Sequence, residues 1–400
     1  MTEVAGVVSS GGLREPAVEG DVLLPHQREL AQLQRLRGRA FLRASEAAAL
    51  ADAHDALPPL ATDEDSEVVR LLTRPLSSKL EIPEYYRYTC LHAYAWFLDR
   101  HPDDPVAGAL VALDVTMRDL LAVERTAAPW VTGPTFPDGR IARLEEFIAA
   151  LRDTVLNPVL LTRIGDLVDR GAATAEQARR SALLAECTRF PRSDRHEEQV
   201  FLRVVQACEL LFFLVRHLAL EVMAAAERFP AWATSRLAIA GECARHLNRV
   251  LHVLQTLTPE GFMSFREATG AASAVQSLNY HAMEITIYGY DPRKAAVFSS
   301  IEHLGGFNRA EVKNGRSLSS VLADADDTRL AKGWHELDRG LSKWRGAHYR
   351  FARTYLSADE AASGGTEGAP YVKRFVKKDA CVAGPGSFAD VDLINGFLYL

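Results

Sequence analysis

Residues 330–355 read LAKGWHELDRGLSKWRGAHYRFARTY, and this stretch decides the fold that the sequence predicts. Large side chains recur along it every three or four residues, as Leu330, Trp334, Leu337, Leu341, Trp344, His348, Phe351 and Tyr355. This spacing is typical of a helix that buries one face. We therefore predict a single long helix over 327–356, with the imidazole of His348 on its buried stripe.

The same spacing runs through most of the chain from residue 26 onward. It predicts helices over 27–53, 84–100, 105–124, 142–156, 175–186, 232–257 and 273–287. A further helix is expected to begin at a capping box formed by Asp194 and Glu197. Prolines and glycines predict a long loop at 128–139. Because no region alternates with period two for long, the predicted class is all-α, a helical bundle.

The pattern divides the chain into three parts. Residues 1–20 are rich in Gly, Ser and Val without a period, which predicts a flexible tail. Residues 21–190 are predicted to form a helical N-terminal region, and residues 191–400 a second helical region with sharper periodicity.

Composition excludes several classes of protein. The chain has 400 residues, of which 48% are hydrophobic and 24% charged, and a formal net charge of −6 without a basic cluster. This balance does not favour binding to nucleic acid or to a membrane surface. The five cysteines are scattered singly, without the paired spacing of a zinc site or of covalent haem attachment. We find no signal peptide and no apolar stretch that spans a bilayer, and therefore expect a cytoplasmic protein.

His348 is the candidate metal ligand. A lone histidine on an apolar helix face is more often a core residue, but a neutral imidazole can also bind haem iron. Trp344 and Phe351, four residues before it and three after it, would then provide flat walls for a porphyrin. The glycine-rich run at 363–368 follows fifteen residues later and allows close approach to a ligand, although such a run is most often a plain connection.

Arg266 is the candidate anion-binding residue. Its guanidinium follows apolar residues in FMSFRE, residues 262–267, and has the geometry to hold a carboxylate with two hydrogen bonds. The alternative is a surface ion pair with Glu267 or Glu284, which spacing alone favours.

Four blocks in this order resemble the tryptophan 2,3-dioxygenase family of haem oxygenases. They are EEQVFLRVVQACELLF (197–212), RHLNRVLHVLQ (245–255) with FRE (265–267) and ASAVQSL (272–278), KWRGAH (343–348) and SGGTEGAPY (363–371). The late segment DVDLIN (390–395) also fits. The resemblance covers roughly residues 195–400. Residues 21–190 show no match, and the family's short tyrosine-bearing N-terminal element is not recognisable before Asp194.

The resemblance implies the family's helical bundle, a b-type haem in residues 191–400, and roles by position. His348 falls on the proximal haem ligand, and Trp344 lies beside the cofactor. Arg266 falls on the arginine that binds the substrate carboxylate, and Phe201 on an aromatic residue that packs against the substrate ring. The substrate's amino-acid end would be contacted by Ser363, Gly364 and Thr366. Val205 departs from the pattern, because it falls on the family's distal histidine, which contacts the indole N–H.

The implied activity is that of a haem-dependent oxygenase that inserts dioxygen into tryptophan or a substituted indole. The resemblance also implies a homo-oligomer. We favour a dimer, because the long first half would cover the pocket within one chain, and the unmatched first half suggests a role in secondary metabolism. Three alternatives stay open. They are a haem-dependent hydroxylase of a tyrosine-like ring that uses peroxide or dioxygen, a non-catalytic haem-binding protein, and a helical scaffold without haem.

Overall fold

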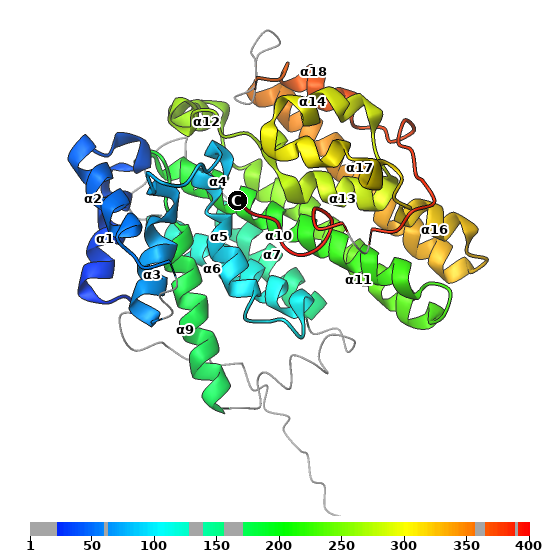
Figure 1. The fold of residues 1–400 in the computed structure, drawn as a ribbon, viewed down its shortest axis with the longest axis horizontal. Coiled ribbons are helices and arrows are strands. Elements are labelled where there is room, and N and C mark those ends of the chain that lie inside the picture. The colour runs from blue at the N-terminus through cyan, green and yellow to red at the C-terminus, as the bar shows by residue number, and fades with distance from the viewer. Residues whose placement is uncertain (1–21, 60–62, 128–138, 156–170, 357–364, 389–390) are drawn as a thin grey trace, which may run out of the picture.

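A computed structural model describes residues 22–59, 63–127, 139–155, 171–356, 365–388 and 391–400 (Figure 1). Regular structure within these ranges is helical, apart from two isolated β-bridges that join Tyr290 to Val382 and Gly315 to Gly386. The all-α prediction is therefore confirmed. The predicted tail at 1–20 and the predicted loop at 128–139, except Gly139, lie outside the described residues.

Helices occur throughout both halves of the described chain. The first half contains α1 (Pro25–Arg37), α2 (Ala44–Asp55), α3 (Glu64–Thr73), α4 (Glu84–Thr89), α5 (Leu91–Leu98), α6 (Pro105–Ala127), α7 (Arg140–Val155) and α9 (Gly171–Thr188). The second half contains α10 (His196–Ala225), α11 (Pro230–Leu254), α12 (Pro259–Arg266), α13 (Leu278–Tyr288), α14 (Ala295–Ser300), α15 (Ala310–Lys313), α16 (Leu318–Asp324), α17 (Thr328–Tyr355) and α18 (Ala369–Arg374). None of the helices in the described ranges is long and apolar enough to cross a membrane.

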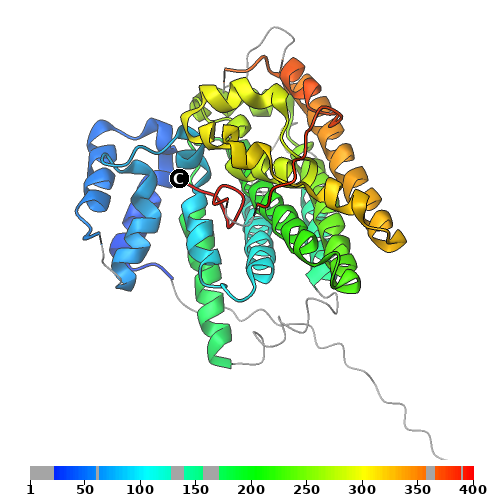
Figure 2. The same cartoon turned by 45° about the vertical axis from the view of Figure 1, so that its right-hand side comes forward.

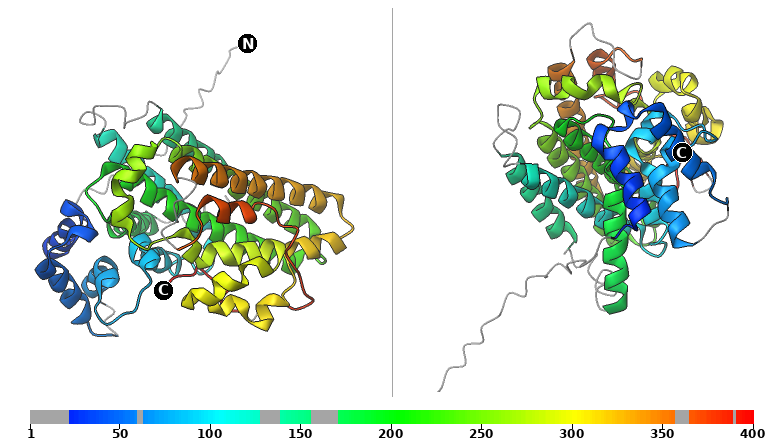
Figure 3. Two further views of the ribbon diagram at one scale, coloured as in Figure 1. Left: turned by 90° about the horizontal axis from the view of Figure 1, so that it is seen from above. Right: turned by 90° about the vertical axis from the view of Figure 1, so that its left-hand side faces the viewer.

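The centre of the fold is a layer of three long helices, in which α11 packs against α10 on one side and α17 on the other (Figures 1 and 3). Small residues bring α17 close to α11. A Cβ atom on Gly333 would lie 2.9 Å from Leu237, and one on Gly340 would lie 2.9 Å from Ala244. Because these glycines are seven residues apart, they fall on one face of α17, and the close approach repeats after two turns.

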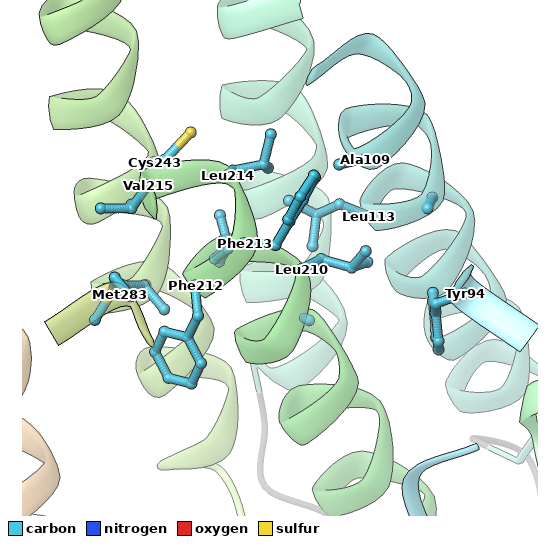
Figure 4. Packing of buried hydrophobic residues seen from close by; sticks show 14 of the residues in the cluster. Tyr94, Ala109, Leu113, Leu210, Phe212, Phe213, Leu214, Val215, Cys243 and Met283 are labelled. Carbon is cyan, nitrogen blue, oxygen red and sulfur yellow. The ribbon is translucent and has the colours of Figure 1, made fainter. Parts of the chain in front are cut away.

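Helix α10 is buried on nearly all sides and connects the two halves of the chain. Its Phe213 lies towards Leu113 of α6, whereas Phe212 lies on the side of Met283 of α13 (Figure 4). One continuous apolar core runs from Leu23 near the start of the described chain to residue 394. The first-half helices are seen beside α10 in Figure 2. The boundary between residues 190 and 191 stays a prediction.

The predicted helix over 273–287 begins only at Leu278, after a separate 3-10 turn at Ala274–Gln276 and the extended residue Ser277. Two further predicted helices are interrupted within their length, and both interruptions were missed. The predicted helix over 27–53 is wrong as a single element, because Gly38, with φ of 79°, separates α1 from α2. A Cβ atom on Gly38 would lie 2.4 Å from the carbonyl oxygen of Arg192, so the break is fixed by a contact with a distant segment. The predicted helix over 84–100 is likewise divided into α4 and α5 at Cys90, with φ of 54°.

The predicted capping box of Asp194 and Glu197 is also wrong. The N-cap of α10 is Arg195, and it makes no side-chain cap hydrogen bond. Instead, the carboxylate of Glu198 accepts hydrogen bonds from the backbone N–H groups of Arg192 (2.7 Å) and Ser193 (2.8 Å). The turn before the helix is therefore held by a carboxylate one residue later than the sequence pattern predicts.

Candidate functional site

His348 lies on α17 as predicted, in a half-buried position, and its imidazole has no hydrogen-bond partner among the described residues. Its ring stacks on Trp344 one turn earlier, with centroids 5.4 Å apart. Burial lowers its pKa to about 4, so the ring is neutral at physiological pH. A neutral, unengaged imidazole has a free lone pair, which is the state in which histidine binds metal.

Within the described residues, this lack of a hydrogen-bond partner distinguishes His348 from the buried histidines. Each of those has an acceptor or donor within hydrogen-bond distance: Leu71 O for His92, Phe97 O for His101, Thr154 Oγ1 for His246 and Val275 O for His281. Buried polar groups are normally satisfied in this way. His348 is therefore set apart as a candidate ligand rather than a core histidine.

Trp344 forms the side of the site that lies deepest in the core. It is 4% exposed, and its indole Nε1 is buried without a hydrogen-bond partner in the described part of the chain. Its ring meets Phe212 of α10 at 5.4 Å and Tyr280 of α13 at 5.9 Å between centroids. Helices α10, α13 and α17 thus meet at this aromatic cluster.

A second aromatic cluster lies further along α10 and α17, towards the start of α10 and the end of α17. Phe201 of α10 contacts Phe262 and Phe265 of α12, with centroids 5.5 Å apart in each pair. Phe262 in turn meets Tyr355, which stacks on Phe351 of α17. This cluster joins α10 to α17 one to two turns beyond His348.

Val205 and Cys208 lie on α10 between the two clusters. Phe201, Val205, Cys208 and Phe212 follow one another at intervals of four, three and four residues, so they share one face. Val205 and Cys208 are only half-buried and pack against the core. Of the predicted site residues, Trp344 and His348 stack on each other, and Phe201 and Val205 lie on one face of α10.

Arg266 is the last residue of α12 and directly follows Phe265. It is half-exposed, and partial burial lowers the pKa of its guanidinium. The alternative pairing with Glu284 is wrong, because Glu284 is buried against Arg345, Lys294 and Lys378. The contact between Phe265 and Phe201 brings the end of α12 to the Phe201 side of the site.

The glycine-rich segment is described only in part. Ser363 and Gly364 lie outside the described residues. Thr366 is half-buried, and it is flanked by Gly365 and Gly368, with φ of 71° and 69°. These left-handed conformations favour glycine and turn the chain into α18.

Tyr88 of α4 is a neighbour of the site that the sequence reasoning missed. It is 2% exposed and packs with Leu202, Ala272 and Phe201. The only local signal was a concentration of tyrosines, three within residues 85–88, in a stretch read simply as helix. The first half of the chain therefore contributes side chains next to Phe201.

Several curated proteins similar to this chain bear the name of the family that the sequence blocks resemble. No family model matches the chain. A tryptophan 2,3-dioxygenase of Anaeromyxobacter dehalogenans (strain 2CP-C) is 26% identical over 232 residues, which cover 46% of this chain and 83% of that protein. One of Bacillus thuringiensis (strain Al Hakam) is 24% identical over 226 residues, covering 46% and 80%. The chain is a distant relative of the tryptophan 2,3-dioxygenases.

A shorter and more similar match concerns Xanthomonas euvesicatoria pv. vesicatoria (strain 85-10). Its tryptophan 2,3-dioxygenase is 31% identical over 109 residues, which cover 27% of this chain and 37% of that protein. Each of these three matches covers less than half of this chain.

Proposed function

We propose that this protein is a haem-dependent oxygenase that inserts dioxygen into tryptophan or a substituted indole. The observation that carries the proposal is the neutral imidazole of His348 beside Trp344, between two aromatic clusters, which has no hydrogen-bond partner among the described residues. The relationship to proteins named tryptophan 2,3-dioxygenase supports the same reaction class.

His348 would hold the iron of a b-type haem, with Trp344 packed beside the macrocycle. The donor set fits this group, because one neutral imidazole in apolar surroundings is suited to hold a haem iron. When bound, haem would supply an iron that can bind dioxygen. The apolar side chains of α10 would exclude water from the site.

The substrate would be held at its two ends. Arg266 would pair with the carboxylate, while Phe201 packs against the ring. Thr366, with Ser363 and Gly364, would contact the amino-acid end. Both carboxylate oxygens can accept from one guanidinium, which fixes orientation as well as affinity.

Val205 supports dioxygen insertion over ring hydroxylation. Insertion places both oxygen atoms in the product and needs no external reductant, and an electron-rich indole can attack without first losing its N–H proton. Hydroxylation instead breaks the O–O bond heterolytically, with one oxygen atom leaving at the level of water, and that cleavage benefits from a nearby acid-base group. A valine side chain cannot donate or accept a proton.

Replacing Val205 by histidine should narrow the range of indoles that bind. An apolar residue discriminates a methyl-sized difference by only roughly 1–3 kcal/mol, so the wild type should accept both tryptophan and 1-methyltryptophan. Histidine would offer a partner to a free indole N–H and disfavour the methylated ring. Dissociation constants measured by optical titration should diverge in the variant, with haem content unchanged. An unaltered preference would contradict this role of Val205.

We expect a homodimer in which residues 21–190 cover the pocket of their own chain. The contact of Tyr88 with Phe201 and Leu202 supports this arrangement, because it brings the first half against the site without a second copy. Light scattering at micromolar concentration should give twice the chain mass of 44.0 kDa. A monomer would contradict the expectation.

The visible spectrum of the purified protein tests the proposed function. We expect a Soret band that shifts when tryptophan or a methylated indole is added. A shift with tyrosine alone would favour a hydroxylase. The absence of any Soret band, even after haem is supplied, would overturn the proposal.

A further inference from the structure

Arg140, the first residue of α7, is a fully buried guanidinium in the half of the chain that the resemblance does not cover. It has an acceptor for each of its five N–H donors. Two donate to Thr256, at Oγ1 (2.8 Å) and at the carbonyl oxygen (3.2 Å). The other three meet Glu197 Oε1 (3.3 Å), Glu197 Oε2 (2.7 Å) and Glu124 Oε2 (3.3 Å). One side chain of α7 therefore joins α6, α10 and the residues that follow α11.

Both carboxylates around Arg140 lie in the interior. Glu124 of α6 is 0% exposed and Glu197 of α10 is 7% exposed. The other oxygen of Glu124, Oε1, lies 2.9 Å from Nε2 of His196. A buried charge is costly unless it is paired, so neither carboxylate can move away from the guanidinium without a large loss. The three helices are consequently held together at one point.

The same guanidinium holds the turn that leads into α12. Thr256 lies two residues before Thr258, the N-cap of α12, whose hydroxyl oxygen accepts a hydrogen bond from Gly261 N–H at 3.0 Å. Between them, the carbonyl oxygen of Leu257 accepts from the hydroxyl of Tyr355 on α17. The start of α12 is therefore fixed by one side chain from α7 and one from α17.

Glu197 connects this point to the Phe201 end of the candidate site. Glu197 and Phe201 are one turn apart on α10 and share a face. A Cβ atom on Gly261 would lie 3.3 Å from Glu197 Cγ, so the Glu197 side chain packs directly against α12. One turn further along α10, Phe201 meets the aromatic side chains of α12. Arg140 thus holds both elements whose side chains meet there, and α12 ends at Arg266.

We propose that Arg140 is a positioning residue for recognition of the substrate carboxylate. By holding Glu197 and Thr256 together, it fixes α12 against α10 and so places Arg266 at the Phe201 end of the site. The inference rests on the proposed function, because that function gives Arg266 the carboxylate of the substrate. A pair of parallel hydrogen bonds depends strongly on geometry, so a small displacement of α12 would weaken it.

Lysine cannot replace Arg140 in this role. Its ammonium keeps the positive charge between the carboxylates, but its three donors sit on one nitrogen and cannot reach Thr256 and both carboxylates together. Arg140→Lys therefore releases the turn while it leaves the buried charges paired. Thr256→Val is a second, milder variant, because it has nearly the same shape and removes only the hydroxyl acceptor.

Hydrogen–deuterium exchange of the haem-free full chain, followed by mass spectrometry, tests the structural step. Local opening of α12 (Pro259–Arg266) should become more frequent in both variants. We expect its amides to exchange on the order of tenfold faster in Arg140→Lys and roughly two- to tenfold faster in Thr256→Val. The amides of α3 should be unchanged, which separates a local effect from general loss of stability. Arg152→Lys, at an exposed position of the same helix, is the matched control and should exchange like wild type.

Titration of the haem-loaded protein with tryptophan and with tryptamine tests the functional step. Arg140→Lys should weaken tryptophan binding by on the order of tenfold and tryptamine binding by less. Adding Arg140→Lys to Arg266→Lys should cause little further loss of tryptophan affinity, because both residues act through one contact. A residue that supports only the general fold would lower both affinities equally.

The inference is overturned if α12 exchanges at the wild-type rate in both Arg140→Lys and Thr256→Val. It is also overturned if the losses from Arg140→Lys and Arg266→Lys simply add, or if Arg140→Lys weakens tryptophan and tryptamine alike. Failure of the proposed function would look different. Wild type would then show no spectral response to tryptophan, although exchange in α12 would still distinguish Arg140→Lys from Arg152→Lys, and only the part in substrate binding would fall.

Discussion

Replacing His348 by alanine should abolish the Soret band of the haem-reconstituted protein and leave its helical circular dichroism intact. The reason is that one imidazole would carry the whole bond to the iron. The ring is half-buried and makes no hydrogen bond to any described residue, and its described ring contact is the stack on Trp344. Loss of such a stack costs only about 0.5–1.5 kcal/mol, so the helix should persist.

Two controls separate ligation from packing. His335→Ala alters an exposed histidine on the same helix and should keep full haem content. Added imidazole should restore a Soret band in His348→Ala, because it can enter the vacated position and bind the iron. Retention of the wild-type spectrum in His348→Ala would contradict the assignment of His348 as the haem ligand.

Replacing Arg266 by lysine should weaken tryptophan binding by on the order of tenfold to a hundredfold. A charge-assisted pair contributes roughly 1.5–3 kcal/mol, and the point charge of lysine cannot reproduce a planar two-bond contact. Tryptamine, which lacks the carboxylate, should bind wild type and variant alike. Dissociation constants from optical titration of the haem-loaded protein provide the measurement.

Arg309→Lys, at an exposed position away from α12, serves as the control and should leave both dissociation constants unchanged. An equal loss of tryptophan and tryptamine affinity in Arg266→Lys would show that this side chain supports the fold of the site instead of reading the carboxylate.

The spacing of apolar residues along the chain predicted those helices that bury one continuous face. The stripe of α17 and the face of α10 were predicted because a helix repeats its buried side every three to four residues. The break at Gly38 was not predictable in this way, since it depends on the backbone of Arg192, which is distant in sequence. Cys90 adopts a conformation that ordinary residues rarely take, and its sequence carries no signal for it.

The same distinction applies to the candidate site. Spacing along α17 placed His348 and Trp344 on a buried face, and spacing along α10 did the same for Phe201. Spacing within a helix could not identify the partners of Glu284, because Lys294, Arg345 and Lys378 come from three separate segments. Spacing favoured an ion pair between Arg266 and a nearby acidic residue. In the folded chain, however, Glu284 pairs with these three cations and not with Arg266.

The fate of oxygen tests the central claim most directly. The reduced, haem-loaded protein is incubated with tryptophan under ¹⁸O₂, and the mass of the product is measured by mass spectrometry. We predict that both ¹⁸O atoms appear in a single indole-derived product, and that His348→Ala yields none. A product carrying only one ¹⁸O atom, or no oxygenated product from any indole under these conditions, would contradict dioxygen insertion by this protein.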